Sequence, residues 1–105
     1  MRAWILGDAG TANQDQRNVR DAYKNYVNTN NLYTDMILML GDNAYTSGTD
    51  VEYQNSFFDI YPEMLRKTAV WSTRGNHDSY SGNNYYDIFN NPTNGEAGGI
   101  PSGTE

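Results

Sequence analysis

The sequence predicts an α/β fold with a parallel sheet, in the order β-α-β-α-β, and three observations lead to this prediction. Three short apolar stretches are separated by segments in which apolar residues recur at helical spacing. Each apolar stretch runs into a glycine, and the residue after that glycine is Asp or Asn. Strands that alternate with helices form parallel sheets with right-handed crossovers. The Gly-Asp and Gly-Asn pairs should therefore meet at the carboxyl edge of one sheet, where such folds bind ligands.

The first strand and the first helix are expected near the start of the chain. Residues 3–6 are a short apolar run, and Thr11 with Gln14 has the spacing of a capping box at a helix start. The residues that follow at i, i+3, i+4, i+7 and i+8 predict one apolar helix face: Val19, Ala22, Tyr23, Tyr26 and Val27. Residues 28–31, which are rich in Asn, should end this helix.

The second half of the pattern repeats the first. Residues 36–40 are apolar at every position, as in a parallel strand that is covered on both faces. Thr49 and Glu52 form a second capping box, and a helical stripe follows at Tyr53, Phe57 and Ile60. Pro62 should interrupt or restart this helix. Residues 68–73 are rich in β-branched and aromatic side chains and predict the third strand.

One domain, or part of a larger one, is expected over residues 1–105, with an ordered core at about 1–80. Residues 81–105 are rich in Gly, Asn, Ser and Tyr and are predicted to be loop-rich. In this segment Tyr85, Tyr86, Ile88 and Phe89 offer the apolar anchors. We interpret this composition as a loop that leads into a second half of the fold, which makes the sequence a fragment of a longer domain.

Composition excludes several classes of function. The chain has 7 Lys and Arg against 13 Asp and Glu, a formal charge of −6, and no cluster of basic residues, which argues against nucleic-acid binding. No apolar stretch approaches the roughly 18 residues that a membrane span needs. The absence of cysteine excludes disulfides and thiolate metal sites. A hydrophobic content of 37% allows a modest core.

Oxygen donors dominate the predicted sheet edge. Asp8, Asp42, Tyr45 and Asn76 lie at or just after strand ends. Two carboxylates at one place repel each other unless cations neutralise them. Paired metal ions about 3.5–4 Å apart are a recurrent device for phosphoryl hydrolysis, and Asp42, on the central motif, would bridge such a pair. Each Gly-Asp pair alone would be an ordinary turn, but three complementary motifs at equivalent strand ends favour a site.

These motifs resemble those of the calcineurin-like metallophosphoesterases, and within them the purple acid phosphatases. That branch carries GDxG, GDxxY and GNH followed by Asp or Glu. Here the motifs are GDAG at residues 7–10, GDNAY at 41–45 and GNHD at 75–78. The resemblance implies a four-layer α/β/β/α sandwich, of which this chain would supply the truncated β-α-β-α-β half. It also implies hydrolysis of phosphate monoesters at an iron-containing two-metal centre.

The resemblance also implies roles for the metal-binding residues. Asp8 and Tyr45 would bind the first metal, Asp42 would bridge both, and Asn76 would bind the second. The cofactors would be Fe(III) and a second divalent metal, which is iron, zinc or manganese. A tyrosinate ligand is what distinguishes an iron(III) site.

Two further residues would act on the substrate. By the same resemblance, His77 would contact the phosphate or protonate the leaving alcohol, and Asp78 would orient His77. Secretion or a periplasmic location would also follow from the family, where secretion is common.

Two departures from the family pattern limit what the chain would do alone. The superfamily usually has a histidine two residues after the first Asp, where this sequence has Gly10. The later VxxH and GHxH motifs, whose histidines complete both metal sites, are absent, and the single histidine belongs to GNHD. On this interpretation the chain alone is inactive and binds divalent metal weakly.

Two alternatives remain open at this stage. One is a non-catalytic α/β module that holds a single Mg²⁺ or Ca²⁺ through its strand-end carboxylates, since oxygen ligands suit hard cations. The other is a purely structural α/β domain, which leaves the repeated motifs unexplained. Metal identity separates the first alternative from the phosphatase, because a simple Mg²⁺ site has no use for Tyr45.

Overall fold

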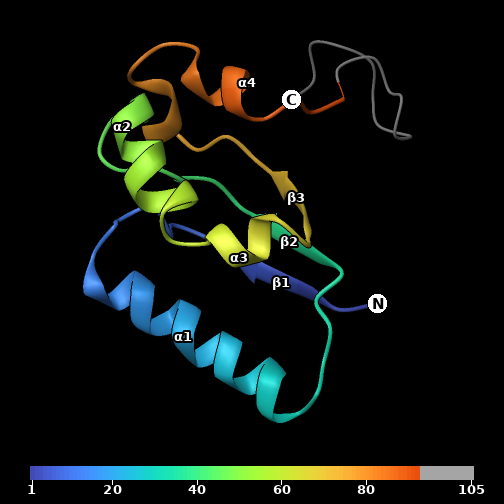
Figure 1. Cartoon of the computed structure of the whole chain (residues 1–105). Coiled ribbons are helices and arrows are strands. Elements are labelled where there is room, and N and C mark those ends of the chain that lie inside the picture. Colours follow the sequence, from blue (N-terminus) through green and yellow to red (C-terminus); the bar gives the residue numbers. More distant parts are fainter. Residues whose placement is uncertain (93–105) are drawn as a thin grey trace.

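A computed structural model describes residues 1–92 and confirms the predicted order of the elements. The strands are β1 (Ala3–Leu6), β2 (Met36–Met39) and β3 (Ala69–Ser72). They form a parallel sheet in the order β1-β2-β3, so β2 is central. All the strand arrowheads in Figure 1 point toward the side of the molecule where α2 lies. The loops that carry the three predicted motifs therefore leave the sheet at one edge.

One face of the sheet is covered by helices. The register aligns Trp4 with Ile37 and Ile37 with Val70, so these residues share that face. On the opposite face, Ile5 and Trp71 are 57% and 41% exposed. The prediction that the central strand is covered on both faces is therefore confirmed for one face only within residues 1–92. This is the arrangement of a parallel-sheet half-domain.

Helix α1 (Gln14–Thr29) is present as predicted, but it begins two residues later than the predicted box implies and has a different cap. The cap residue is Asn13, whose Oδ1 accepts a hydrogen bond from the backbone N–H of Gln16 at 3.0 Å. The Gln16 side chain in turn accepts a hydrogen bond from the Ala12 N–H at 2.7 Å. The predicted box of Thr11 and Gln14 is therefore wrong. The Thr11 hydroxyl instead donates to Asn13 Oδ1 and supports the actual cap.

The predicted apolar face of α1 is only partly the face that packs. Tyr23 stacks on Trp4 of β1 with ring centroids 4.1 Å apart. Buried Gln16 donates from Nε2 to the carbonyl oxygen of Ser56 at 2.7 Å. These two contacts fix the rotation of the helix. As a result Val19 and Tyr26 remain 55% exposed, which corrects their assignment to the core.

The connection between β2 and β3 is helical, as predicted. It contains α2 (Asp50–Tyr53), a π-helical turn η1 (Gln54–Phe58) and α3 (Pro62–Leu65). The capping box of Thr49 and Glu52 is confirmed in both directions. Pro62 opens α3 at a position where a missing N–H costs no helical hydrogen bond.

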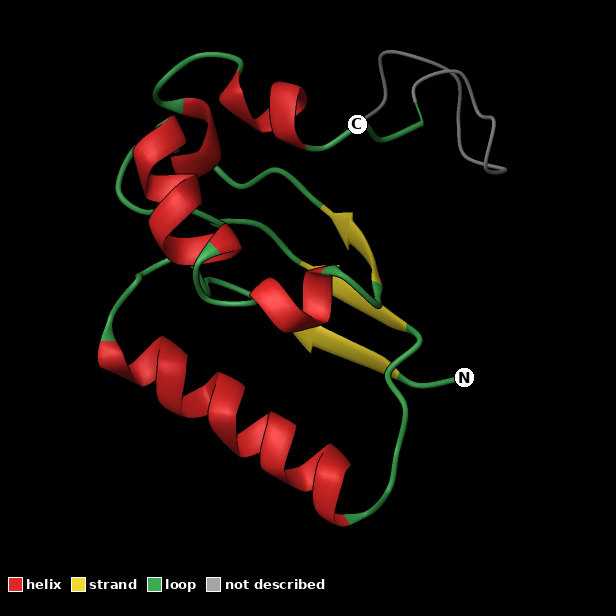
Figure 2. Cartoon of the chain, viewed as in Figure 1, coloured by secondary structure: helices red, strands yellow, loops and turns green. Residues whose placement is uncertain are grey.

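Two short helical turns follow β3 within residues 1–92. They are the 3₁₀ turn η2 (His77–Ser79) and α4 (Asn84–Ile88), which appears in Figure 2 beyond the carboxyl edge of the sheet. The segment after residue 80 was predicted to be loop-rich with apolar anchors; it contains the short helix α4, and Tyr85 and Phe89 are buried as anchors. The remaining part of that prediction, residues 93–105, lies outside the described residues. Within residues 1–92 no helix is both long and apolar enough to cross a membrane.

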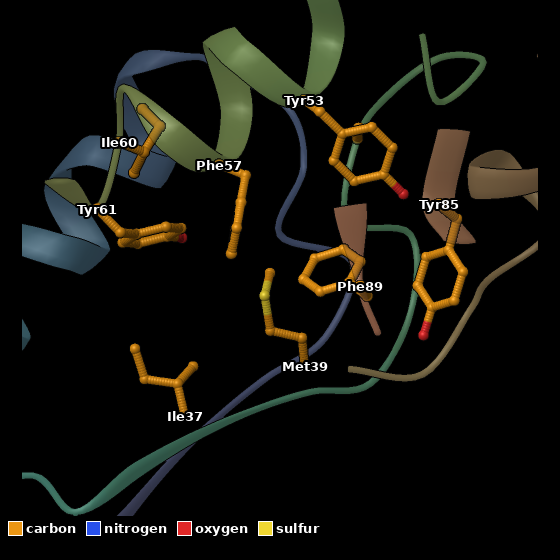
Figure 3. Close-up of a cluster of buried hydrophobic side chains, with 9 residues drawn as sticks. Ile37, Met39, Tyr53, Phe57, Ile60, Tyr61, Tyr85 and Phe89 are labelled. Carbon is orange, nitrogen blue, oxygen red and sulfur yellow. The ribbon is translucent and has the colours of Figure 1, made fainter. Parts of the chain in front are cut away.

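The core lies between the covered face of the sheet and the helical turns. In Figure 3, Ile37 and Met39 of β2 point up toward the rings of Phe57, Tyr61 and Phe89. Phe57 and Phe89 meet edge to face with centroids 5.2 Å apart. This aromatic cluster fixes α2 and α4 against the sheet, and so places the segments that border the carboxyl edge.

Candidate metal centre

The loops after β1 and β2 are joined by backbone hydrogen bonds. The Asp8 N–H donates to the Gly41 carbonyl at 3.2 Å, and the Gly10 N–H donates to the Asp42 carbonyl at 3.2 Å. A third bond runs from the Tyr45 N–H to the Gly10 carbonyl at 2.8 Å. Asp8 and Asp42 both have left-handed backbone conformations, with φ of 51° and 53°. Non-glycine residues adopt this conformation rarely, and such strain is concentrated at functional sites.

Two glycines allow these loops to approach each other. A Cβ on Gly10 would lie 2.3 Å from the carbonyl carbon of Asn43. A Cβ on Gly75 would lie 2.2 Å from Asp42 Oδ1. Both distances are far below van der Waals contact. A histidine at position 10 would therefore collide with the loop after β2 in this structure.

Tyr45 joins the two strand-end carboxylates. Its hydroxyl oxygen lies 3.1 Å from Asp8 Oδ1 and 3.2 Å from Asp42 Oδ2. Three oxygen atoms from the loops after β1 and β2 therefore converge at the carboxyl edge of the sheet. A cation needs such a cluster of oxygen ligands, and here the Tyr45 hydroxyl lies within hydrogen-bonding distance of both carboxylates. These residues fit a metal with oxygen-donor ligands.

The environment keeps the Tyr45 hydroxyl protonated. Burial raises the pKa of Tyr45, and the hydrogen bonds to the carboxylates of Asp8 and Asp42 raise it further, because they favour the protonated phenol.

Asn76 lies at the start of the turn after β3. Its Nδ2 donates a hydrogen bond to the hydroxyl of Tyr80 at 2.8 Å. The backbone beside it contacts the central motif, because the N–H of His77 donates to Asp42 Oδ1 at 3.0 Å. The structure therefore brings the Asn76 segment to Asp42, while the Asn76 amide itself is turned to Tyr80.

The His77 ring is held by a backbone carbonyl. Its Nδ1 lies 2.6 Å from the carbonyl oxygen of Thr46. Because a carbonyl can only accept a hydrogen bond, the proton is on Nδ1, and Nε2 is the nitrogen that remains for chemistry. The ring also packs between Tyr45 and Tyr80, with centroids 4.6 and 5.0 Å away.

Asp78 is buried, and its carboxylate does not contact the His77 ring that it was predicted to orient. The carboxylate is 1% exposed and accepts hydrogen bonds from the Asn43 N–H, Asn43 Nδ2, the Tyr53 hydroxyl and the Gly75 N–H. It thus joins the loops after β2 and β3 to the end of α2. The contact with the His77 ring that the sequence prediction assumed is made by Thr46 instead. The reason is local, since successive side chains of the η2 turn point in different directions.

Burial raises the pKa of Tyr53, and the hydrogen bond to Asp78 adds to this effect. The Tyr53 hydroxyl therefore stays protonated and donates to the carboxylate. Sequence reasoning placed Tyr53 in the core stripe and missed this bond. The available signal was the residue type, because a buried tyrosine normally needs a partner for its hydroxyl.

Thr46 and Tyr80 were also missed. Thr46 acts through its backbone, which no side-chain pattern reveals. Tyr80 follows the GNHD motif closely, and that position was the one available signal. Within the described residues, no point gathers three or more His, Cys, Asp or Glu side chains. The candidate ligands are two carboxylates together with a phenol and an amide.

Comparison with known families identifies the kind of domain. The family model for the calcineurin-like phosphoesterases matches residues 1–102. The chain belongs to this family. A calcineurin-like phosphoesterase domain indicates metal-dependent hydrolysis of phosphoesters. Searches of curated proteins and of solved structures returned no significant match.

Proposed function

We propose that this calcineurin-like domain belongs to an acid phosphatase of the purple type, which hydrolyses phosphate monoesters at a centre of Fe(III) and a second divalent metal. The observation that supports the finer assignment is the position of the Tyr45 hydroxyl between Asp8 and Asp42. A phenol that gives up its proton to a metal favours a trivalent ion. A Mg²⁺ or Ca²⁺ module would have no need of it.

Four residues would hold the metals. Asp8 and Tyr45 would bind the iron, Asp42 would contribute one oxygen to each metal, and Asn76 would bind the second metal. When bound, the two cations neutralise the charge of the phosphate and lower the pKa of a water so that it can attack phosphorus. Secretion or a periplasmic location is part of the same proposal, as in other purple phosphatases.

His77 would protonate the leaving group. With Nδ1 fixed on the Thr46 carbonyl, the proton at Nε2 of the imidazolium is the one transferred to the alcohol oxygen as its bond to phosphorus breaks. Packing between Tyr45 and Tyr80 restricts rotation of the ring. Asp78 supports this arrangement indirectly, because its hydrogen bonds hold the loops after β2 and β3 together.

The test is turnover of aryl phosphates by the iron- and zinc-loaded complete domain, which supplies the histidine ligands that this chain lacks, because the chain alone is expected to be inactive. We expect His77→Ala to keep both metals and to lower turnover by about 10²–10⁴-fold. The loss should shrink as the leaving alcohol becomes more acidic, because a good leaving group needs less protonation. Asp87→Asn, which changes an exposed carboxylate on α4, is the control and should behave as wild type. Absence of turnover in the wild-type complete domain would contradict the proposed function.

A further inference from the structure

Tyr80 lies beside two residues of the candidate metal centre, and no sequence pattern assigns it a role. It follows the η2 turn and is 60% exposed. Its hydroxyl accepts a hydrogen bond from Asn76 Nδ2 at 2.8 Å. Its ring meets the His77 ring edge to face at 5.0 Å. Because Tyr80 is mostly exposed, burial of its ring contributes little to fixing its position. Its contacts with Asn76 and His77 do so instead.

In this structure the hydrogen bond to Tyr80 engages the NH₂ end of the Asn76 amide. An asparagine binds a metal through its carbonyl oxygen, because the amide nitrogen carries two protons and has no lone pair available. Side-chain amides of exposed asparagines rotate between two broad orientations, one of which would turn the NH₂ group to the cation. In this structure the NH₂ group is held by Tyr80.

We propose that Tyr80 is a positioning residue of the second metal site, which acts by holding the Asn76 amide so that Oδ1 is the atom available to the metal. This inference rests on the proposed function, in which Asn76 is a ligand. Tyr80 would be an outer partner of the ligand, like the groups that orient metal-binding histidines and carboxylates. The same ring restricts His77, so the metal ligand and the proton donor share one support.

Manganese binding tests the proposal without any need for turnover. The probe is Mn²⁺ alone, titrated into the protein by calorimetry, with wild type, Asn76→Ala, Tyr80→Phe and the double variant compared. Tyr80→Phe keeps the ring and removes the hydroxyl, and we expect it to weaken Mn²⁺ binding by about tenfold, the lower end of the effect of such outer partners. The double variant should bind no more weakly than Asn76→Ala, because Tyr80 acts only through Asn76.

A control and a second readout separate this role from a general effect on the fold. Tyr26→Phe makes the same change at a tyrosine of α1 with similar exposure, 55%, and should leave Mn²⁺ affinity unchanged. In the metal-free protein, the Asn76 side-chain NH₂ signals in nuclear magnetic resonance should show slowed hydrogen exchange that Tyr80→Phe abolishes.

The outcomes distinguish this inference from the function on which it rests. If Asn76→Ala binds Mn²⁺ as tightly as wild type, the proposed metal site itself is wrong. If Asn76→Ala weakens binding but Tyr80→Phe does not, the positioning role of Tyr80 alone is overturned. A double variant that binds more weakly than Asn76→Ala would also overturn it, because Tyr80 would then act by another route.

Discussion

Replacing Asp78 by asparagine tests whether this carboxylate holds the loops or takes part in proton transfer. Oδ1 accepts from the Asn43 N–H at 3.0 Å and from the Tyr53 hydroxyl at 2.5 Å. Oδ2 accepts from Asn43 Nδ2 at 3.0 Å and from the Gly75 N–H at 2.8 Å. An amide keeps one acceptor oxygen and replaces the other with an NH₂ group. Whichever way the amide turns, two of these donors lose the carboxylate oxygen that accepts their hydrogen bonds.

The expected loss of stability in Asp78→Asn follows from the number of hydrogen bonds lost. A hydrogen bond to a charged group contributes about 1.5–3 kcal/mol, so losing two should lower the free energy of unfolding by about 3–6 kcal/mol. Small domains are stable by only about 5–15 kcal/mol, so the variant would be close to unfolding. Tyr53→Phe removes one donor and leaves the carboxylate intact. Its expected cost is about 1.5–3 kcal/mol.

Urea unfolding followed by tryptophan fluorescence measures both changes, with Asp87→Asn as the exposed control. The order of stability should be wild type, then Tyr53→Phe, then Asp78→Asn. A different result would refute this account of Asp78. If Asp78→Asn unfolds like wild type but has lower turnover with an altered pH profile, the carboxylate acts on His77, as the sequence alone suggested.

Two further predictions concern the loops around the site. Gly75→Ala should weaken metal binding, because the added Cβ collides with Asp42. The expected loss is about tenfold or more, the size of effect that follows when metal ligands are displaced. Gly7→Ala is the control and should bind metal normally, because its Cβ would meet nothing closer than 3.6 Å. Glu52 is the second case. Desolvation would raise its pKa, but hydrogen bonds from the Thr49, Thr46 and Ser47 N–H groups outweigh this and lower it. Its stabilisation is therefore present above the unfolded pKa of about 4.3 and is lost as pH falls through the lower folded value. Glu52→Gln should thus be less stable at pH 7 and show a shallower loss of stability in acid unfolding; equal acid dependence in both proteins would contradict this.

The fold was largely predictable because its signals are local. Apolar runs and helical spacing are set by side chains close together in the sequence, and the capping box of Thr49 and Glu52 lies within one turn. The rotation of α1 was not predictable in this way. It depends on Tyr23 meeting Trp4 and on Gln16 meeting Ser56, which are contacts between segments far apart in the chain.

The same difference between local signals and long-range contacts applies to the candidate site. Parallel topology alone brings Asp8, Asp42 and Tyr45 to one edge, and the structure places their oxygens within hydrogen-bonding distance. The orientations of His77 and Asp78 were not predictable, because they depend on a backbone carbonyl and on a buried tyrosine. Motif spacing identifies which residues meet, but it does not specify which atoms face each other.

The most direct test of the central proposal is the visible absorption spectrum of the oxidised, iron-loaded protein, compared with Tyr45→Phe at matched iron content. A phenolate bound to iron(III) absorbs visible light by charge transfer, whereas a protonated phenol does not. We expect the wild-type protein and the Tyr26→Phe control to be coloured, and Tyr45→Phe to be bleached while remaining folded, because only the oxygen is removed. Equal colour in wild type and Tyr45→Phe would exclude Tyr45 from the metal site and contradict the assignment to the purple phosphatases.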